Sequence, residues 1–121
     1  MKLMLAAATA AAALLAGCAT SPTQQAEIGY ARGSLGYAAM TKGDWQKAES
    51  QLMRTNQDDP ARLLNLAQVY RVTERDLAAR DLYAKVLEED DMQLVLSDGS
   101  VVSAHTVAKS ALQTTATAAR N

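Results

Sequence analysis

The chain has 121 residues, with 12 basic and 13 acidic side chains and a formal net charge of −1 at neutral pH. This length suffices for one small domain, and the balanced, interspersed charge excludes the basic surface that nucleic-acid binding requires. The chain has no Phe, one Trp and four Tyr. We therefore expect a core of Ala, Leu and Val in closely packed helices.

Residues 1–17 carry the pattern of a secretory signal peptide. Lys2 supplies a positive charge, the run from Leu3 to Leu15 is apolar, and small residues follow. The apolar run is shorter than the roughly 20 residues that a membrane-spanning helix needs. We expect this segment to be removed, and we exclude it from the fold.

The sequence Leu15-Ala16-Gly17-Cys18 closes this signal and contains the only cysteine of the chain. It resembles the lipobox of bacterial lipoproteins, in which the cysteine sulfur is acylated and cleavage occurs just before it. Several acyl chains, each contributing about 0.8 kcal/mol per buried methylene, hold a protein stably on a membrane. The resemblance implies lipid attachment at Cys18. A free thiol, a disulfide to another chain and an ordinary secreted protein remain as alternatives.

The residue after this cysteine is Ala19. In the lipoprotein family an Asp at this position often retains the protein at the inner membrane. The resemblance therefore implies a bacterial cell envelope protein on the periplasmic face of the outer membrane. Residues 18–25 are polar, contain Pro22, and are expected to form a short lipidated tether.

After the tether the pattern becomes helical, with apolar residues at spacings of three and four. Gly43 is suited to ending one helix and Asp44 to capping the next. Asp59-Pro60 predicts the start of a third helix, with proline at the first helical position. Asp76 is expected to cap a fourth helix. The connections are short, so neighbouring helices must be antiparallel.

Two segments of this region are similar to each other. The stretch from Gly43 to Ala48 precedes Leu52 by the interval at which Glu74 to Ala79 precedes Tyr83. Residues 26–91 resemble two tetratricopeptide (TPR) repeats, a family with a period of about 34 residues. The matching residues are Leu35, Gly36, Gly43, Trp45, Ala48, Leu52 and Pro60, then Asn65, Leu66, Ala67, Tyr70, Ala79, Tyr83, Val86 and Leu87.

The TPR resemblance implies an all-α fold of antiparallel helix pairs. The chain departs from the family at Glu74, where a turn glycine is usual, and at Asp91, where a proline often closes the repeat. An unrelated array of four helices remains the alternative. Gly29, Gly33 and Gly36 are expected to share one helical face, thin enough for a neighbouring helix or protomer to approach.

Residues 92–121 are expected to cover the end of the repeats. Met92 to Leu96 is β-prone, the turn sequence from Ser97 to Ser100 follows, and Val101-Val102 completes a short hairpin. Ser103 is expected to cap a closing helix that runs to about residue 117, followed by a frayed tail.

The TPR resemblance also implies a partner-binding groove lined by the first helix of each pair. A peptide or helix of a protein partner is expected to bind there, because Tyr, Met and Arg are enriched at interfaces. Carrying the groove positions over residue by residue gives Tyr30, Tyr37, Met40, Thr41, Leu64, Gln68 and Arg71.

The sequence provides no catalytic constellation, cofactor motif or metal-ligand spacing. His105 is the only histidine, and the only cysteine is the expected lipid attachment point, so the sequence offers no set of metal ligands around His105. The acidic run from Glu88 to Asp91 lacks the spacing of a calcium loop and is expected to be a solvated helix end. We expect a non-enzymatic, membrane-anchored module that binds a protein partner in envelope, secretion or pilus assembly. The alternative is a self-assembling structural envelope lipoprotein, in which the chain forms homo-oligomers.

Overall fold

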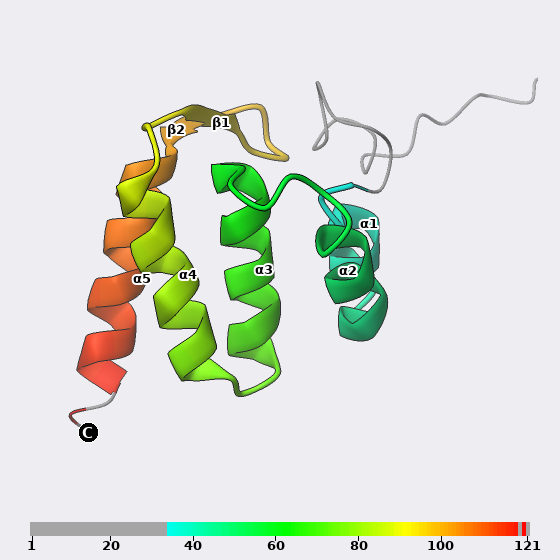
Figure 1. Cartoon of the computed structure of the whole chain (residues 1–121), viewed down its shortest axis with the longest axis horizontal. Coiled ribbons are helices and arrows are strands. Elements are labelled where there is room, and N and C mark those ends of the chain that lie inside the picture. The colour runs from blue at the N-terminus through cyan, green and yellow to red at the C-terminus, as the bar shows by residue number, and fades with distance from the viewer. Residues whose placement is uncertain (1–33, 119, 121) are drawn as a thin grey trace, which may run out of the picture.

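The computed structural model describes residues 34–118 and 120. This part of the chain is mainly helical with one small antiparallel sheet (Figure 1). The signal segment, Cys18, the tether, Gly29, Tyr30 and Gly33 lie outside the described residues. The elements, in chain order, are α1 (Tyr37–Thr41), α2 (Trp45–Leu52), α3 (Pro60–Val72), α4 (Asp76–Glu88), β1 (Gln93–Val95), β2 (Val101–Ser103) and α5 (Ala104–Ala118).

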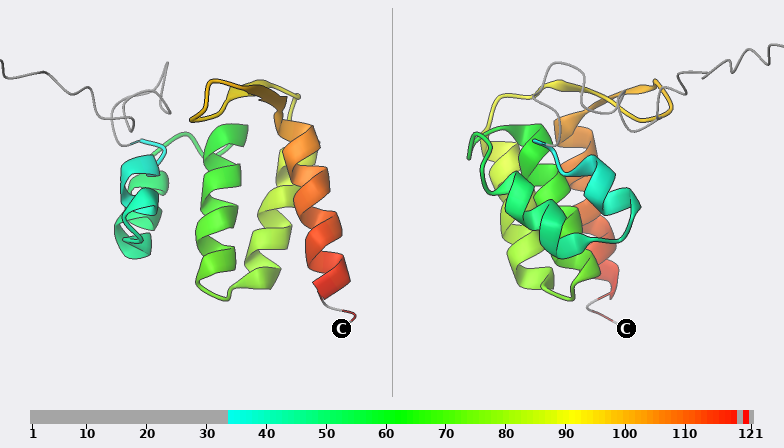
Figure 2. Two further views of the ribbon diagram at one scale, coloured as in Figure 1. Left: turned by 180° about the vertical axis from the view of Figure 1, so that it is seen from behind. Right: turned by 90° about the vertical axis from the view of Figure 1, so that its right-hand side faces the viewer.

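Helix α3 lies in the middle of the helices, and α3, α4 and α5 each contact the other two. Figures 1 and 2 show α1 and α2 on one side of α3, and α4 and α5 on the other. The hairpin of β1 and β2 lies across the end at which α3 and α5 begin. Helices α3 and α5 therefore both run away from the hairpin, with α4 antiparallel to them.

The turn between α1 and α2 has the predicted chemistry. Gly43 adopts a left-handed conformation with φ 72°, which costs glycine little because it has no Cβ. The Asp44 side chain accepts a hydrogen bond from Lys47 N at 3.1 Å and so caps α2. The Asp44 N–H donates to the Ala39 carbonyl at 2.9 Å and closes the end of α1.

The turn between α3 and α4 repeats this geometry without a glycine. Glu74 takes the left-handed position with φ 62°, and Arg75 N donates to the Tyr70 carbonyl at 2.8 Å. The expectation that Asp76 caps α4 is wrong, because Arg75 is the N-cap residue and Asp76 is the first residue of the helix. The Asp76 carboxylate still lies in the first turn, where the helix dipole favours negative charge.

The start of α3 is as predicted. The Asp59 side chain accepts a hydrogen bond from Ala61 N at 3.1 Å, and Pro60 occupies the first helical position. Proline fits there because its missing N–H would have no partner inside the helix.

Gly36 departs from the expectation of a glycine face on a long first helix. It is the N-cap residue of the five-residue helix α1, with φ 65° in the left-handed region. A Cβ at this position would lie 3.0 Å from the Ala48 carbonyl oxygen and 3.3 Å from Leu52 Cγ. The chain therefore needs glycine here both for its backbone conformation and for its close approach to α2.

The hairpin and the last helix follow the predicted order. Leu94 pairs with Val102 in the antiparallel register, and Gly99 provides the left-handed turn position with φ 83°. The Ser103 hydroxyl accepts a hydrogen bond from Thr106 N at 3.3 Å, as a helix cap does. Helix α5 continues to Ala118, so the first residues of the expected frayed tail are helical.

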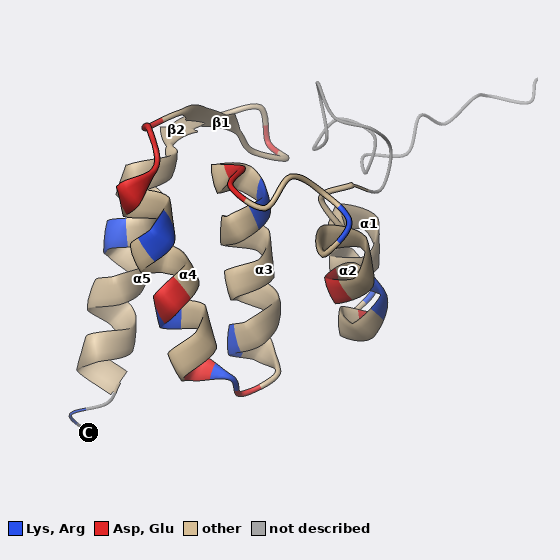
Figure 3. Ribbon diagram, in the orientation of Figure 1, with Lys and Arg blue, Asp and Glu red and all other residues tan. Residues whose placement is uncertain are grey.

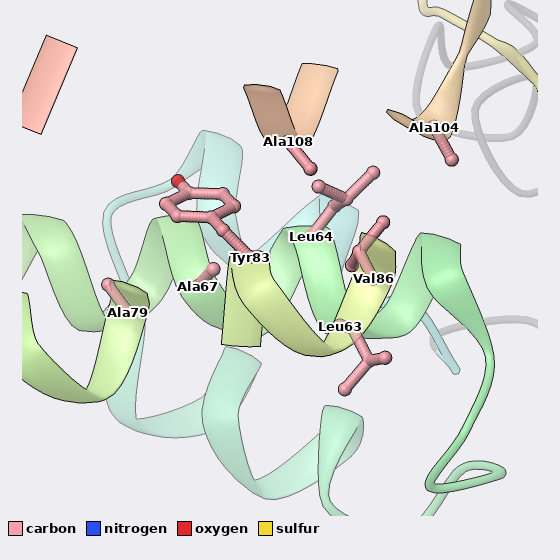
Figure 4. Close-up of a cluster of buried hydrophobic side chains, with 8 residues drawn as sticks. All are labelled: Leu63, Leu64, Ala67, Ala79, Tyr83, Val86, Ala104 and Ala108. Atoms are coloured by element: carbon pink, nitrogen blue, oxygen red, sulfur yellow. The ribbon is translucent and has the colours of Figure 1, made fainter. Parts of the chain in front are cut away.

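Two clusters of buried side chains stabilise the fold. The larger joins α3, α4 and α5 (Figure 4) and contains Leu63, Leu64, Ala67, Ala79, Tyr83, Val86, Ala104 and Ala108. The smaller joins α1, α2 and α3 and contains Ala39, Ala48, Leu52, Leu66 and Val69. Alanines at the helix contacts allow the helices to approach closely, as the composition predicts.

Candidate protein-binding groove

A groove of about 520 Å³ lies between α3 and α5, under the hairpin. Its lining comes from three helices, from both strands of the hairpin and from the turn that follows β1. Helix α3 contributes Leu64, Asn65, Gln68 and Arg71; α5 contributes Thr106, Val107, Ser110, Ala111 and Thr114; the hairpin contributes Leu94, Leu96 and Val102; and α4 contributes Tyr83.

Helical spacing places the two sets of side chains on facing surfaces. Gln68 and Arg71 are three residues apart on α3, so they lie on the same face of that helix. Thr106, Ser110 and Thr114 recur every fourth residue and form a matching row on α5. Two polar rims therefore border an apolar floor.

The hairpin forms one end of the groove. Leu94 and Val102 are cross-strand partners, so their side chains share the sheet face that lines the groove. Ala104 N donates to the Met92 carbonyl at 2.8 Å, which fixes the hairpin to the start of α5. Leu96, in the turn after β1, is 43% exposed and offers an apolar contact at this end.

Of the described residues that line the groove, only Arg71 is charged. It lies in the last turn of α3, at the end remote from the hairpin. Among the described residues it forms neither an ion pair nor a side-chain hydrogen bond. The groove thus combines an apolar end under the hairpin with a free guanidinium at its other end.

Tyr83 places a hydroxyl at the groove floor. The residue is 3% exposed, and Figure 4 shows its hydroxyl directed away from Val86. Within the described part of the chain this hydroxyl has no hydrogen-bond partner, yet it is not fully enclosed by protein. A buried tyrosine hydroxyl ordinarily finds a partner, so this one is available to a ligand.

The structure brings together three of the predicted groove residues, Leu64, Gln68 and Arg71. Tyr37, Met40 and Thr41 of α1 do not line this groove, and their contact with a partner stays a prediction. The Met40 side chain instead packs against the smaller buried cluster, and Thr41 Oγ1 donates to the Ala38 carbonyl at 3.0 Å. The reason is that the groove forms beside α5, on the other side of α3 from α1.

The sequence reasoning missed the hairpin and α5 as groove walls. The row of Thr106, Ser110 and Thr114 was the available signal, because hydroxyl residues at a spacing of four indicate one polar helix face. The contributions of Leu94 and Tyr83 depend on tertiary packing and carry no local signal.

The acidic run after α4 has a structural role at Asp91. Figure 3 shows acidic residues gathered in this connection, whereas basic and acidic residues are interspersed over α2 and α4. Asp91 Oδ2 accepts from Ser103 Oγ at 2.5 Å and Oδ1 accepts from His105 N at 3.0 Å. These hydrogen bonds hold the pKa of the Asp91 carboxyl below its ordinary value. His105 Nε2 lies 2.8 Å from the Glu89 carbonyl, so His105 contacts the same connection.

No group of three or more possible metal-ligand side chains is found among residues 34–118 and 120. In the same part of the chain, no helix has the length and apolar character to cross a membrane. In comparisons with known proteins, no family model, curated protein or solved structure matches this chain. The function is therefore proposed from the residues themselves.

Proposed function

We propose that this protein is a non-enzymatic, lipid-anchored scaffold of the bacterial cell envelope that binds a segment of a protein partner in the groove between α3 and α5. The observation that carries the proposal is the groove itself, where Leu64, Gln68 and Arg71 converge with an apolar floor. Such a concave surface with a few placed polar groups is typical of a binding site.

The recurrence of turn geometry supports a TPR-type arrangement. The bond from Asp44 N to the Ala39 carbonyl and the bond from Arg75 N to the Tyr70 carbonyl occupy equivalent places in the two helix pairs. Left-handed residues also occupy equivalent places, at Gly43 and Glu74. Helices α1, α3 and α5 then correspond to the first helices of successive pairs, the helices that line a binding groove in that family.

The lipid anchor is proposed from the Leu15-Ala16-Gly17-Cys18 sequence. Acylation at Cys18 would hold the groove near the periplasmic face of the outer membrane. The partner would then be a protein of an envelope, secretion or pilus assembly.

Site-specific photo-crosslinking in cells tests the groove. A photoreactive amino acid at Gln68, which is exposed within the groove, should give a discrete crosslinked protein band. The same amino acid at Arg80, which is exposed on α4 and outside the groove, should not give this band. Equal crosslinking from both positions, or none from Gln68, would contradict the proposed function.

Membrane fractionation tests the anchor separately. Cys18→Ser should abolish incorporation of radiolabelled palmitate and shift the protein out of the mature membrane-bound form, either as a released chain or as an unprocessed precursor. Wild-type protein that takes up no palmitate would refute the lipoprotein assignment and leave the groove experiment unaffected.

A further inference from the structure

We propose that Met53 is a site of oxidation by peroxide, and that its sulfoxide accepts a hydrogen bond from the buried guanidinium of Arg62. The modified side chain strengthens the attachment of α2 to α3. Neither residue lines the groove, so the site is separate from the proposed binding surface. Three observations support it: the exposure of Met53, the position of its sulfur, and the incomplete hydrogen bonding of Arg62.

The first observation is the exposure of Met53. The described residues include three methionines, and Met53 is the only exposed one among them, at 50%. Met40 packs against the smaller buried cluster and Met92 against the larger one. Oxidation requires that the oxidant reach the sulfur. Met53 is therefore expected to react first.

The reaction adds one oxygen atom to the thioether. The Met53 sulfur attacks one oxygen of hydrogen peroxide, so that an S–O bond forms and the O–O bond breaks. The sulfur is oxidised by two electrons and the peroxide is reduced. The proton of the transferred oxygen passes to the leaving hydroxide, which departs as water. The product is a polar sulfoxide in place of an apolar thioether.

The second observation is the position of the Met53 sulfur beside a buried donor. Arg62 Nη2 donates to Met53 Sδ at 3.6 Å, and Arg62 is 2% exposed. Met53 is the C-cap residue of α2, whereas Arg62 lies in the first turn of α3. A hydrogen bond between these side chains thus joins the end of one helix to the start of the next.

The third observation is that one donor nitrogen of Arg62 has a weak acceptor. Nε and Nη1 donate to the carbonyls of Leu52 and Gln57 at 2.6 and 3.1 Å. Nη2 donates to Gln57 Oε1 at 3.2 Å, and its other acceptor among the described residues is the thioether sulfur. A thioether accepts weakly, whereas a charged N–H forms strong hydrogen bonds to oxygen.

A sulfoxide at Met53 supplies the acceptor that this nitrogen lacks. The side chain is unbranched with three rotatable bonds, so the oxygen can turn toward Arg62 Nη2. Oxidation usually disrupts packing, because it makes an apolar side chain polar. At Met53 it instead replaces a weak acceptor with a strong one, and the junction of α2 and α3 becomes more stable.

Peroxide treatment of the full-length protein, followed by peptide mapping with mass spectrometry, tests the order of oxidation. The Met53 peptide should gain one oxygen atom before the Met40 and Met92 peptides. Native-state hydrogen exchange of the singly oxidised protein then tests the effect on the junction. Exchange in Trp45–Leu52 should slow about two- to tenfold, and exchange in α5 should stay unchanged.

Variants assign the effect to this contact. Met53→Leu, which nearly conserves volume, should make exchange in α2 insensitive to peroxide, whereas Met92→Leu should keep the wild-type response. Arg62→Leu, which removes the donor, should abolish the slowing. Met53→Gln places an amide oxygen near Arg62 without any oxidant. Exchange in its α2 should be slower than in Met53→Leu.

Oxidation of Met40 or Met92 as early as Met53 overturns the proposal. Exchange in α2 that is unchanged or faster after oxidation also overturns it, as does slowing that persists in Met53→Leu or Arg62→Leu. If Arg62→Leu does not fold, equal exchange in Met53→Gln and Met53→Leu overturns the role of the guanidinium.

Discussion

Arg62 shows how one buried residue connects two elements. It is 2% exposed, and its Nε donates to the Leu52 carbonyl at 2.6 Å. Its terminal nitrogens donate to the Gln57 carbonyl at 3.1 Å and to Gln57 Oε1 at 3.2 Å. These acceptors are neutral, but Leu52 ends α2, where the helix dipole favours a cation. Arg62 thereby ties the link after α2 to the first turn of α3.

We predict that Arg62→Leu lowers the free energy of unfolding by on the order of 3 kcal/mol, because it removes the hydrogen bonds that the buried guanidinium donates to Leu52 and Gln57. Arg62→Lys should also destabilise, since an ammonium group cannot reproduce the fork geometry. Urea unfolding followed by circular dichroism measures both effects. Arg80→Leu on the exposed face of α4 serves as the control, with a change within about 0.5 kcal/mol. If Arg62→Leu changes the free energy of unfolding by no more than the Arg80→Leu control, the stabilising role of Arg62 is refuted.

Glu74 and Gly43 both adopt a left-handed backbone conformation. We predict that substitutions at these two positions change stability in opposite directions. Glu74→Gly should stabilise the fold by about 0.5–1 kcal/mol, because it relieves a conformation that a side chain disfavours. Gly43→Ala should destabilise it by about 1 kcal/mol through backbone strain alone, since a Cβ there would meet no atom within 4 Å. Thermal melts of the two variants give the comparison. Two changes of the same sign would show that unfolded-state entropy outweighs the turn conformation.

At the scale of elements, the sequence is most informative where local chemistry fixes the backbone. The caps at Asp44 and Asp59 and the hairpin turn before Val101 follow from side chains that act on their own neighbours. Gly36 lacks such a local signal. Its glycine spacing predicts a helical face, but its backbone conformation is set by the approach to Ala48, which is distant in sequence.

The two walls of the groove also differ in how far the sequence predicts them. The TPR resemblance implies Gln68 and Arg71 as groove residues, and their spacing of three places both on one face of α3. The opposite wall depends on the hairpin inserted before α5, which fixes the position of Ser110 relative to α3. The sequence predicts both the hairpin and the last helix, but not the surface that they form together, because that surface depends on contacts between elements.

The junction of the hairpin and α5 makes stability depend on pH. Hydrogen bonds from Ser103 and His105 lower the pKa of Asp91, and a hydrogen bond from Arg75 lowers the pKa of Glu49. A carboxyl whose pKa is lower in the folded state stabilises the fold above its unfolded-state pKa. This stabilisation is lost as the pH falls through the folded-state value. We predict that stability declines below about pH 4.

Asp91→Asn distinguishes the contribution of Asp91 to the pH dependence of stability from the contributions of the other carboxyl groups. The variant should be less stable than wild type at pH 7 and should lose less stability between pH 5 and pH 2, because its side chain does not titrate. Urea midpoints at each pH provide the measurement. Asp90→Asn, an exposed neighbour in the same acidic run, should retain the wild-type profile. Identical profiles for all three proteins would exclude Asp91 as a contributor.

At the scale of the whole molecule, the two buried clusters meet at α3. Tyr70 and Leu82 pack against both of them. The Arg75 guanidinium lies 4.2 Å from the centre of the Tyr70 ring and forms a paired contact with Glu49 at 3.0 and 2.7 Å. The α1–α2 pair is thus attached to the remaining helices through a small number of contacts.

This arrangement predicts that the molecule opens in two steps. Helices α1 and α2 have five and eight residues, and helices this short have little stability by themselves. They are also packed on the smaller of the two clusters. We therefore expect amide protons in Trp45–Leu52 to exchange faster than those in α3 and α4, at a free energy below that of global unfolding.

Native-state hydrogen exchange measured by mass spectrometry distinguishes this two-step opening from a single cooperative unit. Glu49→Gln, which weakens the contact with Arg75, should increase exchange in α1 and α2 and leave α5 nearly unchanged. Lys85→Gln removes the ion pair of 2.9 Å between Lys85 and Asp58. Because that pair is exposed and lies outside α1 and α2, this substitution should have little effect on them. Equal exchange in all helices of the described residues would show that the two clusters unfold together.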